Sequence, residues 1–314
     1  MARRTIDIDI PSLAGRRAIV TGGSDGIGLR IAARLARAGA EVILPVRNPA
    51  KGDAAAQSIR AEAPAAAVRT LPMDLSSLDS IAAFGDALSS EGAPVHLLIN
   101  NAGVMTPPER QTTADGFELQ FGTNHLGHFA LVGHLLPVLR DGRARVVSQV
   151  SVAANERSIR WDDLNAERSY RAMDSYSQSK IAFGLFGLEL DRRSAALGWG
   201  ITSMLSHPGV APTSLLAARP ELGRAQDTLG VRFIRWGSAR GLLFGTPDTA
   251  ALPALYAATS PASRRGGFYG PGGPGHLGGA PAEQRLYSRL RSEQEAHRVW
   301  EISEQLTGVV YPRG

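Results

Sequence analysis

The sequence predicts an α/β fold, a doubly wound parallel sheet of about seven strands with helices on both faces. Three observations lead to this prediction. Short runs rich in Val, Ile and Leu alternate with longer stretches of helical period, which is typical of right-handed βαβ units. Several of the short runs lack polar alternation, as in strands that are buried on both faces. A glycine-rich turn also separates the first strand from the first helix.

The predicted strands and helices alternate up to residue 208. Gly39 closes the first helix at its C-terminal side, and Pro64 stops the second. After Pro208 the pattern becomes irregular, and we interpret the remainder as additions to the same sheet, so that residues 1–314 form a single domain. Strands are predicted at 17–21, 41–44, 68–73, 95–99, 145–150 and 201–205, helices at 27–38, 54–63 and 249–259, and a C-terminal Gly/Pro loop plus helix at about 266–307.

Composition excludes several classes of protein. Apolar residues make up 43% and charged residues 20% of the 314 residues, which is ordinary globular usage. Cysteine is absent, which excludes disulfides, a thiol nucleophile and a cysteine-based metal site. The net charge of +5 comes from scattered arginines, without a basic run of the kind that binds nucleic acid. No stretch suits a signal peptide or a membrane span, so we expect a cytoplasmic protein with neither nucleic-acid nor membrane partners.

The first strand is followed by a turn that suits a dinucleotide. Residues 21–28 are Thr-Gly-Gly-Ser-Asp-Gly-Ile-Gly. Glycines allow a tight turn and let the backbone approach a pyrophosphate, which then lies on the free amides of the next helix. An ordinary glycine-rich turn is the alternative, but the position between the first strand and helix favours a Rossmann-type nucleotide turn. The residues expected to bind the cofactor here are Gly22, Ser24, Asp25, Gly26, Ile27 and Gly28.

The end of the second strand indicates which nucleotide binds. Folds that prefer NAD place an acidic side chain about 20 residues after the glycines, on the adenosine ribose. This chain has Val46 and Arg47 at that distance. A guanidinium binds a 2′-phosphate in bidentate fashion, so Arg47 favours NADP(H), with NAD as the alternative. A solvent-facing role for Arg47 and the nearby acidic Asp25 both weigh against this interpretation.

Tyr176 and Lys180 are four residues apart at the start of a predicted helix, which places them on one helical face. Tyrosine ordinarily titrates near 10, so acid–base catalysis near neutral pH requires its pKa to fall by about 3 units. A neighbouring ammonium favours the phenolate. Lys51 is the one other lysine in the sequence, so the pairing is informative. A surface contact between the two side chains is the alternative.

With these motifs the chain resembles the short-chain dehydrogenase/reductase family over nearly its whole length. The long segment before Tyr176, which contains Trp161 and Leu164, most resembles the retinol-dehydrogenase-like and protochlorophyllide-reductase-like branch. The resemblance implies that Asn124, Ser151, Tyr176 and Lys180 are catalytic. It further implies cofactor contacts from Asp74, Leu75, Asn101, Ala102, Gly103, Pro208, Gly209, Val210 and Thr213.

The resemblance implies hydride transfer between a nicotinamide and a carbonyl or alcohol. In this reaction Tyr176 is the proton donor, Ser151 orients the substrate oxygen, Lys180 lowers the tyrosine pKa and holds the ribose, and the main chain of Asn124 supports a water relay. Ser148 is an alternative to Ser151. The family's substrate lid corresponds to about 210–245, whose apolar residues predict a small-molecule ketone, aldehyde or alcohol of apolar character. A homo-oligomer is also an expectation from the family.

Other functions compete less well for the same residues. His125 and His128 have a spacing that suits a metal, but no third ligand lies nearby, so no metal is expected. The sequence lacks the Gly-x-Ser-x-Gly motif of serine hydrolases. A nucleotide-sensing regulator without turnover and a carbon–carbon double-bond reductase are the alternatives that share the fold. Trp300, in the last predicted helix, is expected to pack rather than to act in function.

Overall fold

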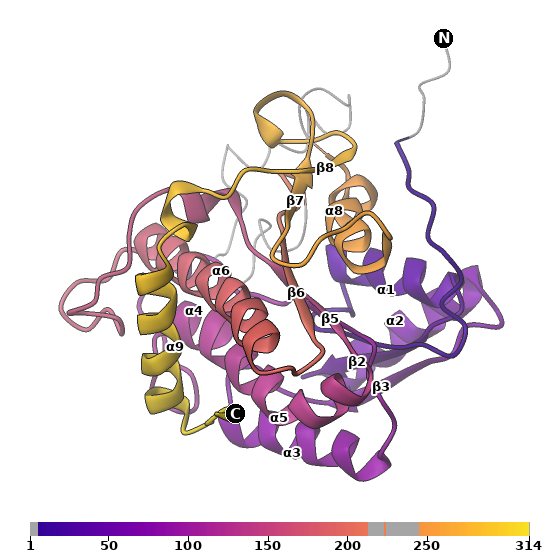
Figure 1. Ribbon diagram of the computed structural model, residues 1–314, viewed down its shortest axis with the longest axis horizontal. Helices are drawn as coiled ribbons and strands as arrows, with labels where there is room; N and C mark the ends of the chain where they lie inside the picture. Colours follow the sequence, from indigo (N-terminus) through magenta and orange to yellow (C-terminus); the bar gives the residue numbers. More distant parts are fainter. Residues whose placement is uncertain (1–5, 213–222, 224–244, 314) are drawn as a thin grey trace.

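A single sheet organises the computed structural model, which describes residues 6–212, 223 and 245–313 (Figure 1). Its strand order is β3-β2-β1-β4-β5-β6-β7-β8, and every neighbouring pair is parallel except β7 and β8. The chain reverses its direction of winding between β1 and β4, so the predicted doubly wound fold is confirmed. The strands are β1 (Arg17–Val20), β2 (Glu41–Val46), β3 (Val68–Pro72), β4 (Leu97–Asn100), β5 (Arg145–Gln149), β6 (Thr202–Ser206), β7 (Phe268–Pro271) and β8 (Pro281–Glu283).

Strand β7 lies where the sequence predicts a Gly/Pro-rich loop, and that part of the prediction is wrong. Phe268 is buried in the core on one face of the sheet, and Tyr269 is buried in the core on the other. Burial on both faces stabilises the strand more than its glycine and proline weaken it. Gly270 is needed within the strand, because a Cβ there would lie 2.0 Å from Nε2 of His207.

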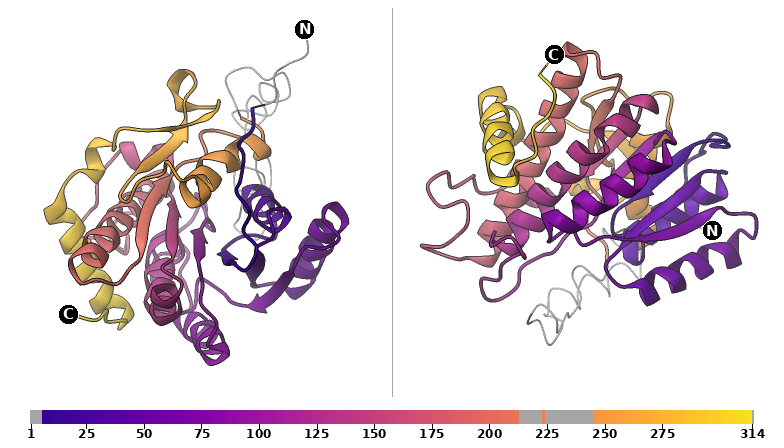
Figure 2. Two further views of the ribbon diagram at one scale, coloured as in Figure 1. Left: turned by 45° about the vertical axis from the view of Figure 1, so that its right-hand side comes forward. Right: turned by 90° about the horizontal axis from the view of Figure 1, so that it is seen from below.

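Helices cover both faces of the sheet (Figures 1 and 2). On one face α1 packs against α2 and α8, and on the other α3 packs against α5 while α6 packs against α9. Two separate hydrophobic cores lie on the two faces. The helices are α1 (Gly26–Arg37), α2 (Pro49–Glu62), α3 (Leu78–Glu91), α4 (Leu119–Phe121), α5 (Gly127–Asp141), α6 (Ala172–Ala196), α8 (Pro247–Thr259) and α9 (Glu293–Thr307), with short helical turns η1 (Gly122–Leu126), η2 (Val152–Asn155), η4 (Pro274–His276) and η5 (Ser288–Leu290).

The last helix, α9, buries an aromatic cluster against α5 and α6. The Trp300 ring lies 5.3 Å from that of Phe129, 5.8 Å from that of Phe186 and 4.5 Å from that of Tyr311. Trp300 is completely buried, which agrees with its predicted packing role. Aromatic rings at these separations attract one another in addition to the surface they bury, so this cluster holds the C-terminal segment on the protein.

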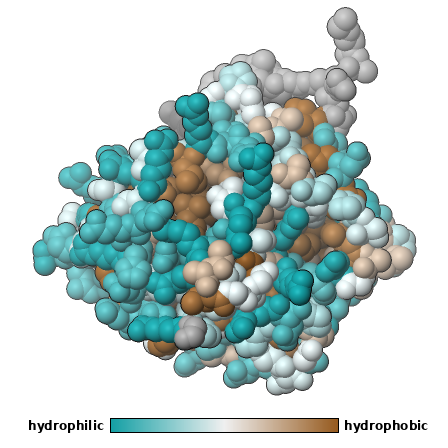
Figure 3. Space-filling model, viewed as in Figure 1, coloured by the Kyte–Doolittle hydropathy of each residue, from teal (hydrophilic) through white to brown (hydrophobic). Residues whose placement is uncertain are grey.

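The surface is mostly hydrophilic on the face shown in Figure 3, with small separate apolar areas. Among the residues described, the large hydrophobic side chains with the greatest exposure are few and scattered: Ile6, Met173, Leu197, Leu306 and Val310. None of the helices in the described ranges has the length and apolar character to cross a membrane.

Candidate active site

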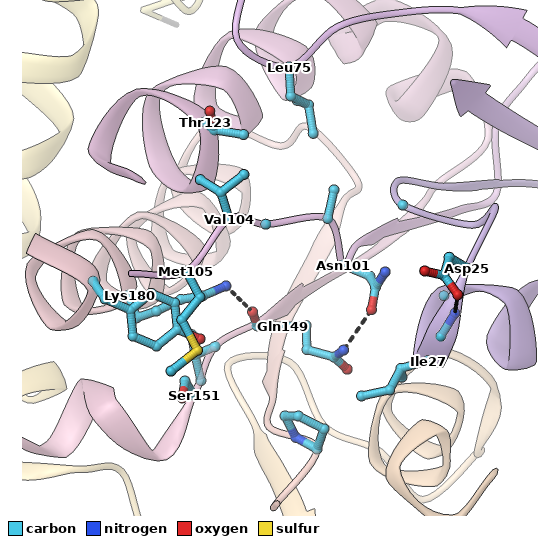
Figure 4. Close-up of a pocket in the computed structure, with 18 of the residues that line it drawn as sticks. Asp25, Ile27, Leu75, Asn101, Val104, Met105, Thr123, Gln149, Ser151 and Lys180 are labelled. Atoms are coloured by element: carbon cyan, nitrogen blue, oxygen red, sulfur yellow. Dashed lines mark hydrogen bonds between the residues drawn. The ribbon is translucent and has the colours of Figure 1, made fainter. Parts of the chain in front are cut away.

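A cavity of about 560 Å³ lies at the carboxyl edge of the sheet, where parallel strands all end. Ligands bind at this edge in doubly wound sheets, beside the point where the strand order reverses. The loops that follow β1 to β6 supply its walls (Figure 4). Every site residue predicted from the sequence lines the cavity except Asn124, which lies behind it, and Thr213, which lies outside the described residues.

The first turn brings the backbone unusually close to itself. Gly22 has φ +64°, and a Cβ on Gly28 would lie 2.1 Å from the carbonyl oxygen of Gly22. Only glycine fits Gly28 without moving the chain. Asp25 begins α1, and its carboxylate accepts a 2.6 Å hydrogen bond from the amide of Gly26. The glycine backbone beside a helix N-terminus fits a pyrophosphate, although Asp25 adds a negative charge there.

The Thr21 side chain ties this turn to the end of β4. Its hydroxyl oxygen accepts hydrogen bonds of 2.9 Å from the amides of both Asn101 and Ala102. In return, Nδ2 of Asn101 donates to the carbonyl of Thr21 at 2.8 Å. The predicted Asn101–Gly103 segment therefore holds the nucleotide turn against the sheet.

Gln149, a residue that the sequence did not indicate, extends this network to β5. Its side-chain Nε2 donates a 2.7 Å hydrogen bond to Oδ1 of Asn101 (Figure 4). Gln149 lines the cavity and is almost fully buried. Its role depends on which strands are neighbours, and no local sequence signal could have revealed it.

Two cations lie where the cavity meets β2 and α2, at its predicted adenosine end. Arg47 follows β2 as predicted, and Lys51 joins it from the first turn of α2. Asn48 begins this helix by accepting a 3.1 Å hydrogen bond from the amide of Lys51. Lys51 was not predicted as a site residue, although the scarcity of lysine is a signal for it: the chain has only two lysines, and both line this cavity.

Tyr176, Ser151 and Lys180 meet at the opposite end. Tyr176 is 3% exposed, and burial raises the pKa of its phenol, while a hydrogen bond with the Ser151 side chain lowers it in part. Burial lowers the pKa of Lys180 to about 8. The ammonium nitrogen donates to the carbonyl of Gln149 at 3.0 Å and lies 5.3 Å from the centre of the Phe183 ring (Figure 4). The expectation of a lowered tyrosine pKa is therefore not met here, because burial disfavours both charged forms.

The structure distinguishes between the two candidate serines. Ser151 lines the cavity and begins η2, where its hydroxyl accepts a 3.3 Å hydrogen bond from the amide of Ala153. Ser148 is completely buried within β5, and a Cβ on Gly187 of α6 would lie 3.4 Å from its hydroxyl oxygen. Ser148 therefore faces a helix rather than the cavity.

Asn124 supports a wall of the cavity instead of lining it. Its Oδ1 accepts from the amide of Val104 at 2.8 Å, and its Nδ2 donates to the carbonyl of Val104 at 3.0 Å and to the Ser179 hydroxyl at 2.9 Å. Asn124 lies in η1, a turn of π-helix, and its own carbonyl accepts from Nδ1 of His128. The expected support of a water relay by this main chain stays a prediction, since a carbonyl oxygen can accept a second hydrogen bond.

The walls around Ser151 and Tyr176 are mainly apolar, which suits the expected substrate. Met105 is on the same side of the cavity as Ser151 and Lys180 in the view of Figure 4, and Asp25 is on the opposite side. The apolar residues at this end are Val104, Met105, Val152, Ala153 and Met173, and the exposed Glu156 is also there. Most of the predicted lid at about 210–245 lies outside the described residues.

His125 and His128 do not converge on a common point. Nε2 of His125 contacts Ser303 of α9, whereas Nε2 of His128 contacts Thr21 of the nucleotide turn. Within the part of the chain that the structure describes, no three His, Asp or Glu side chains form a group that could hold a metal ion.

Comparison with known proteins agrees with this geometry. The chain is 39% identical to human retinol dehydrogenase 13 in an alignment of 307 residues, which covers 96% of this chain and 87% of that protein. It is 37% identical to mouse polyprenol dehydrogenase, over 95% of this chain and 86% of the relative.

Solved structures share the same fold. An uncharacterised protein from Mycobacterium Paratuberculosis superimposes with a TM-score of 0.78 at 35% identity, over 98% of this chain and all of the other. RhlG of Pseudomonas aeruginosa, in a complex with NADP, has a TM-score of 0.61 at 26% identity, over 81% of this chain and 93% of the other. The sequence profile of the family described as short chain dehydrogenase matches residues 16–221. The chain therefore belongs to the short-chain dehydrogenase family of oxidoreductases, among relatives of the retinol dehydrogenase kind.

Proposed function

We propose that this protein reduces apolar aldehydes or ketones, or oxidises the corresponding alcohols, with NADP(H) as the hydride carrier. One observation carries the proposal: a hydroxyl, a phenol and an ammonium meet in the same cavity as a glycine turn that fits a pyrophosphate. A bound nicotinamide supplies or takes up the hydride.

Tyr176 is held in the form that carbonyl reduction needs. Because burial raises its pKa, the phenol keeps its proton at neutral pH and donates it to the substrate oxygen. Ser151 shares the cavity and donates a hydrogen bond to the same oxygen, which stabilises negative charge as it develops. Lys180 is an ammonium below about pH 8, and the Gln149 carbonyl holds it in place. In the oxidative direction this charge favours loss of the tyrosine proton.

Two cations support the choice of NADP(H). Arg47 and Lys51 both line the adenosine end of the cavity and both are exposed. Val46 offers no carboxylate to a free ribose hydroxyl. A phosphate attracts an arginine through charge-assisted hydrogen bonds and a lysine as a point charge, so the pair favours the phosphorylated nucleotide.

The substrate end favours apolar molecules without a carboxylate. Its walls are built from aliphatic and methionine side chains, which suit an apolar ligand. Glu156 lies on the same side and repels anionic substrates. The relatives are named for retinol and polyprenol, two alcohols that carry apolar isoprenoid chains. We therefore propose isoprenoid aldehydes and alcohols as the substrate class.

A substrate screen tests the proposal. Purified protein is mixed with NADPH or NADH and with one carbonyl compound: retinaldehyde, a second isoprenoid aldehyde, an aryl ketone, an enone or pyruvate. The expected result is a kcat/KM at least about 10-fold higher for the apolar carbonyls than for pyruvate, and faster turnover with NADPH. Higher efficiency with pyruvate contradicts the substrate class. Nucleotide binding without turnover of any carbonyl supports a regulator instead, and reduction of only the double bond of an enone supports a double-bond reductase.

A further inference from the structure

His128 lies at the start of α5, between the nucleotide turn and the helix that carries Lys180. It is completely buried. Its Nδ1 lies 3.0 Å from the carbonyl oxygen of Asn124, and its Nε2 lies 3.0 Å from the hydroxyl oxygen of Thr21. On its flat side the ring stacks on Phe183 with 4.9 Å between ring centres. Both nitrogens and the ring face are therefore occupied.

The partners determine where the proton of this imidazole lies. A carbonyl oxygen can only accept, so Nδ1 of His128 carries the hydrogen that binds Asn124. In the neutral ring Nε2 is then an acceptor. Two amides already donate to the Thr21 hydroxyl oxygen, and its own hydrogen has two acceptors within reach, the carbonyl of Ile99 at 3.3 Å and Nε2 of His128 at 3.0 Å. We assign the hydrogen to Nε2, because that contact is the shorter one. The hydrogen bonds thus run from Thr21 to His128 and from His128 to Asn124.

The surroundings keep the ring neutral. The pKa of His128 falls to about 3, mainly because the ring is buried; the bond to Asn124 opposes the shift, and the positive charge of Lys180 on α6 adds to it. The other titratable group nearby is His125 in η1, whose pKa burial also lowers to about 3. Thr21 contributes only a hydroxyl from the β1 side. The chain of hydrogen bonds therefore stands throughout the neutral pH range.

The two ends of this chain lie where the reaction takes place. Thr21 holds the amides of Asn101 and Ala102 beside the glycine turn. Asn124 holds Val104, which lines the cavity, and Ser179, which adjoins Lys180. A Cβ on Gly103 would lie 3.0 Å from Oδ1 of Asn124 and 3.6 Å from Nζ of Lys180, so these groups are packed with little free space.

We propose that His128 is a positioning residue: its neutral imidazole joins the Thr21 hydroxyl to the Asn124 carbonyl and thereby fixes the nucleotide turn relative to the wall and the lysine of the catalytic end. This rests on the nucleotide-dependent activity proposed above. His128 touches neither substrate nor cofactor and acts through Thr21 and Asn124.

His125 provides a matched control on the same helical segment. It is also completely buried, and its Nε2 lies 2.8 Å from the hydroxyl oxygen of Ser303. Because that hydroxyl donates to the carbonyl of Val299, Nε2 of His125 must carry the hydrogen. The two histidines thus have opposite neutral tautomers, and only His128 contacts the nucleotide turn.

The first experiment measures the tautomers by ¹⁵N NMR of histidine-labelled protein without substrate. The expected result is hydrogen on Nδ1 for His128 and on Nε2 for His125. The Thr21→Val variant should change the His128 signal, whereas Thr21→Ser should keep it. A His128 that is charged, or that carries its hydrogen on Nε2, would overturn the proposal. This readout needs no turnover, so it is independent of the substrate assignment.

The second experiment compares His128→Phe with His125→Phe. Both keep an aromatic ring and lose the hydrogen bonds. For His128→Phe we expect about 10- to 100-fold weaker NADPH binding and a similar loss in kcat, because two buried groups lose a partner. His125→Phe should lower the melting temperature with little change in either constant. Equal effects of the two variants on Kd and kcat, measured below both melting temperatures, would show that His128 is only structural.

Two smaller changes separate the two bonds of His128. His128→Asn places an amide nitrogen near the position of Nδ1. Relative to His128→Phe, it should recover more of the lost kcat than of the lost nucleotide affinity. His128→Gln places an amide oxygen near the position of Nε2. Relative to the same variant, it should recover more of the NADPH affinity than of kcat. If both variants restore both constants alike, the division of roles is wrong. Should His128→Phe fail to fold, these two variants and the tautomer measurement still decide the matter.

Discussion

Nζ of Lys180 donates a 3.0 Å hydrogen bond to the main-chain oxygen of Gln149, although Tyr176 lies one helical turn away from it. The carbonyl is a neutral partner, so the ammonium is buried without full compensation, and its pKa falls to about 8. The same strand end aligns Asn101 through the Gln149 side chain. Gln149 thus connects the lysine to the nucleotide turn.

This buried lysine should make stability depend on alkaline pH. The folded pKa of about 8 lies below the ordinary value of 10.5, so between these values the unfolded chain binds more protons and stability rises with pH. Lys180→Met removes this dependence. From about pH 7 to about pH 10, the unfolding free energy of wild type should gain about 2 to 3 kcal/mol relative to the variant. Urea unfolding of both proteins at both pH values checks this prediction. If the difference in unfolding free energy between wild type and Lys180→Met is the same at the two pH values, the prediction is wrong.

Removing the Tyr176 hydroxyl should stop the reaction without preventing nucleotide binding. Tyr176→Phe keeps the buried ring and deletes only the proton-bearing oxygen. We expect turnover to fall by at least about 10²-fold, because general acid catalysis is lost. NADPH affinity, measured by fluorescence titration, should change little. Wild-type turnover in this variant, with chemistry shown to be rate-limiting, would mean that another group donates the proton.

The two candidate serines should respond very differently to the same change. Ser151→Ala removes a hydroxyl that lines the cavity, and kcat should fall by about 10²-fold. Ser148→Ala removes a buried hydroxyl that faces α6, and kcat should stay near that of wild type. Steady-state kinetics of both variants provide the check. If kcat falls strongly in Ser148→Ala and not in Ser151→Ala, then Ser148 is the catalytic serine.

Arg47 and Lys51 should each contribute to the preference for NADPH. Arg47→Ala should weaken NADPH binding by about 10- to 100-fold, the value of a charge-assisted phosphate contact, and leave NADH nearly unchanged. Lys51→Ala should weaken NADPH less, because a lysine binds phosphate as a point charge. The double change Val46→Asp, Arg47→Ile should favour NADH. Arg16→Ala, an exposed arginine away from the cavity, is the control. Equal NADPH affinity in wild type and Arg47→Ala refutes the assignment.

Three buried histidines should make the protein sensitive to acid. Burial lowers the pKa of His125 and His128 to about 3 and that of His207 to about 4. Below the ordinary value of 6.5 the unfolded chain binds these protons and the folded chain does not, so stability falls as the pH falls. Three protons correspond to about 4 kcal/mol per pH unit between about pH 6 and pH 4. Urea unfolding at several pH values measures this slope. His125→Phe should lower it by the contribution of one proton, about a third of the total. An unchanged slope in that variant contradicts the assignment.

Local patterns in the sequence determined the order of the strands and helices, the glycine turn and the Tyr176–Lys180 pair. These signals depend on residues close together in the chain: apolar runs indicate buried strands, glycines permit a tight turn, and a spacing of four aligns two side chains on a helix. The resemblance to a family then supplied Ser151 and the cofactor-binding segments. The structure gathers these residues at one edge of the sheet because its strands are parallel.

Only the tertiary structure decided the features that depend on neighbours distant in sequence. Strand β7 forms because two cores bury its alternate side chains, which outweighs the local preference of glycine and proline for a loop. Gln149 and His128 act through partners that are distant in sequence, Asn101 and Thr21. The residues next to them in the chain therefore do not indicate their roles. The pKa values of Tyr176 and Lys180 also follow from burial rather than from their spacing, because desolvation opposes the charged form of each side chain.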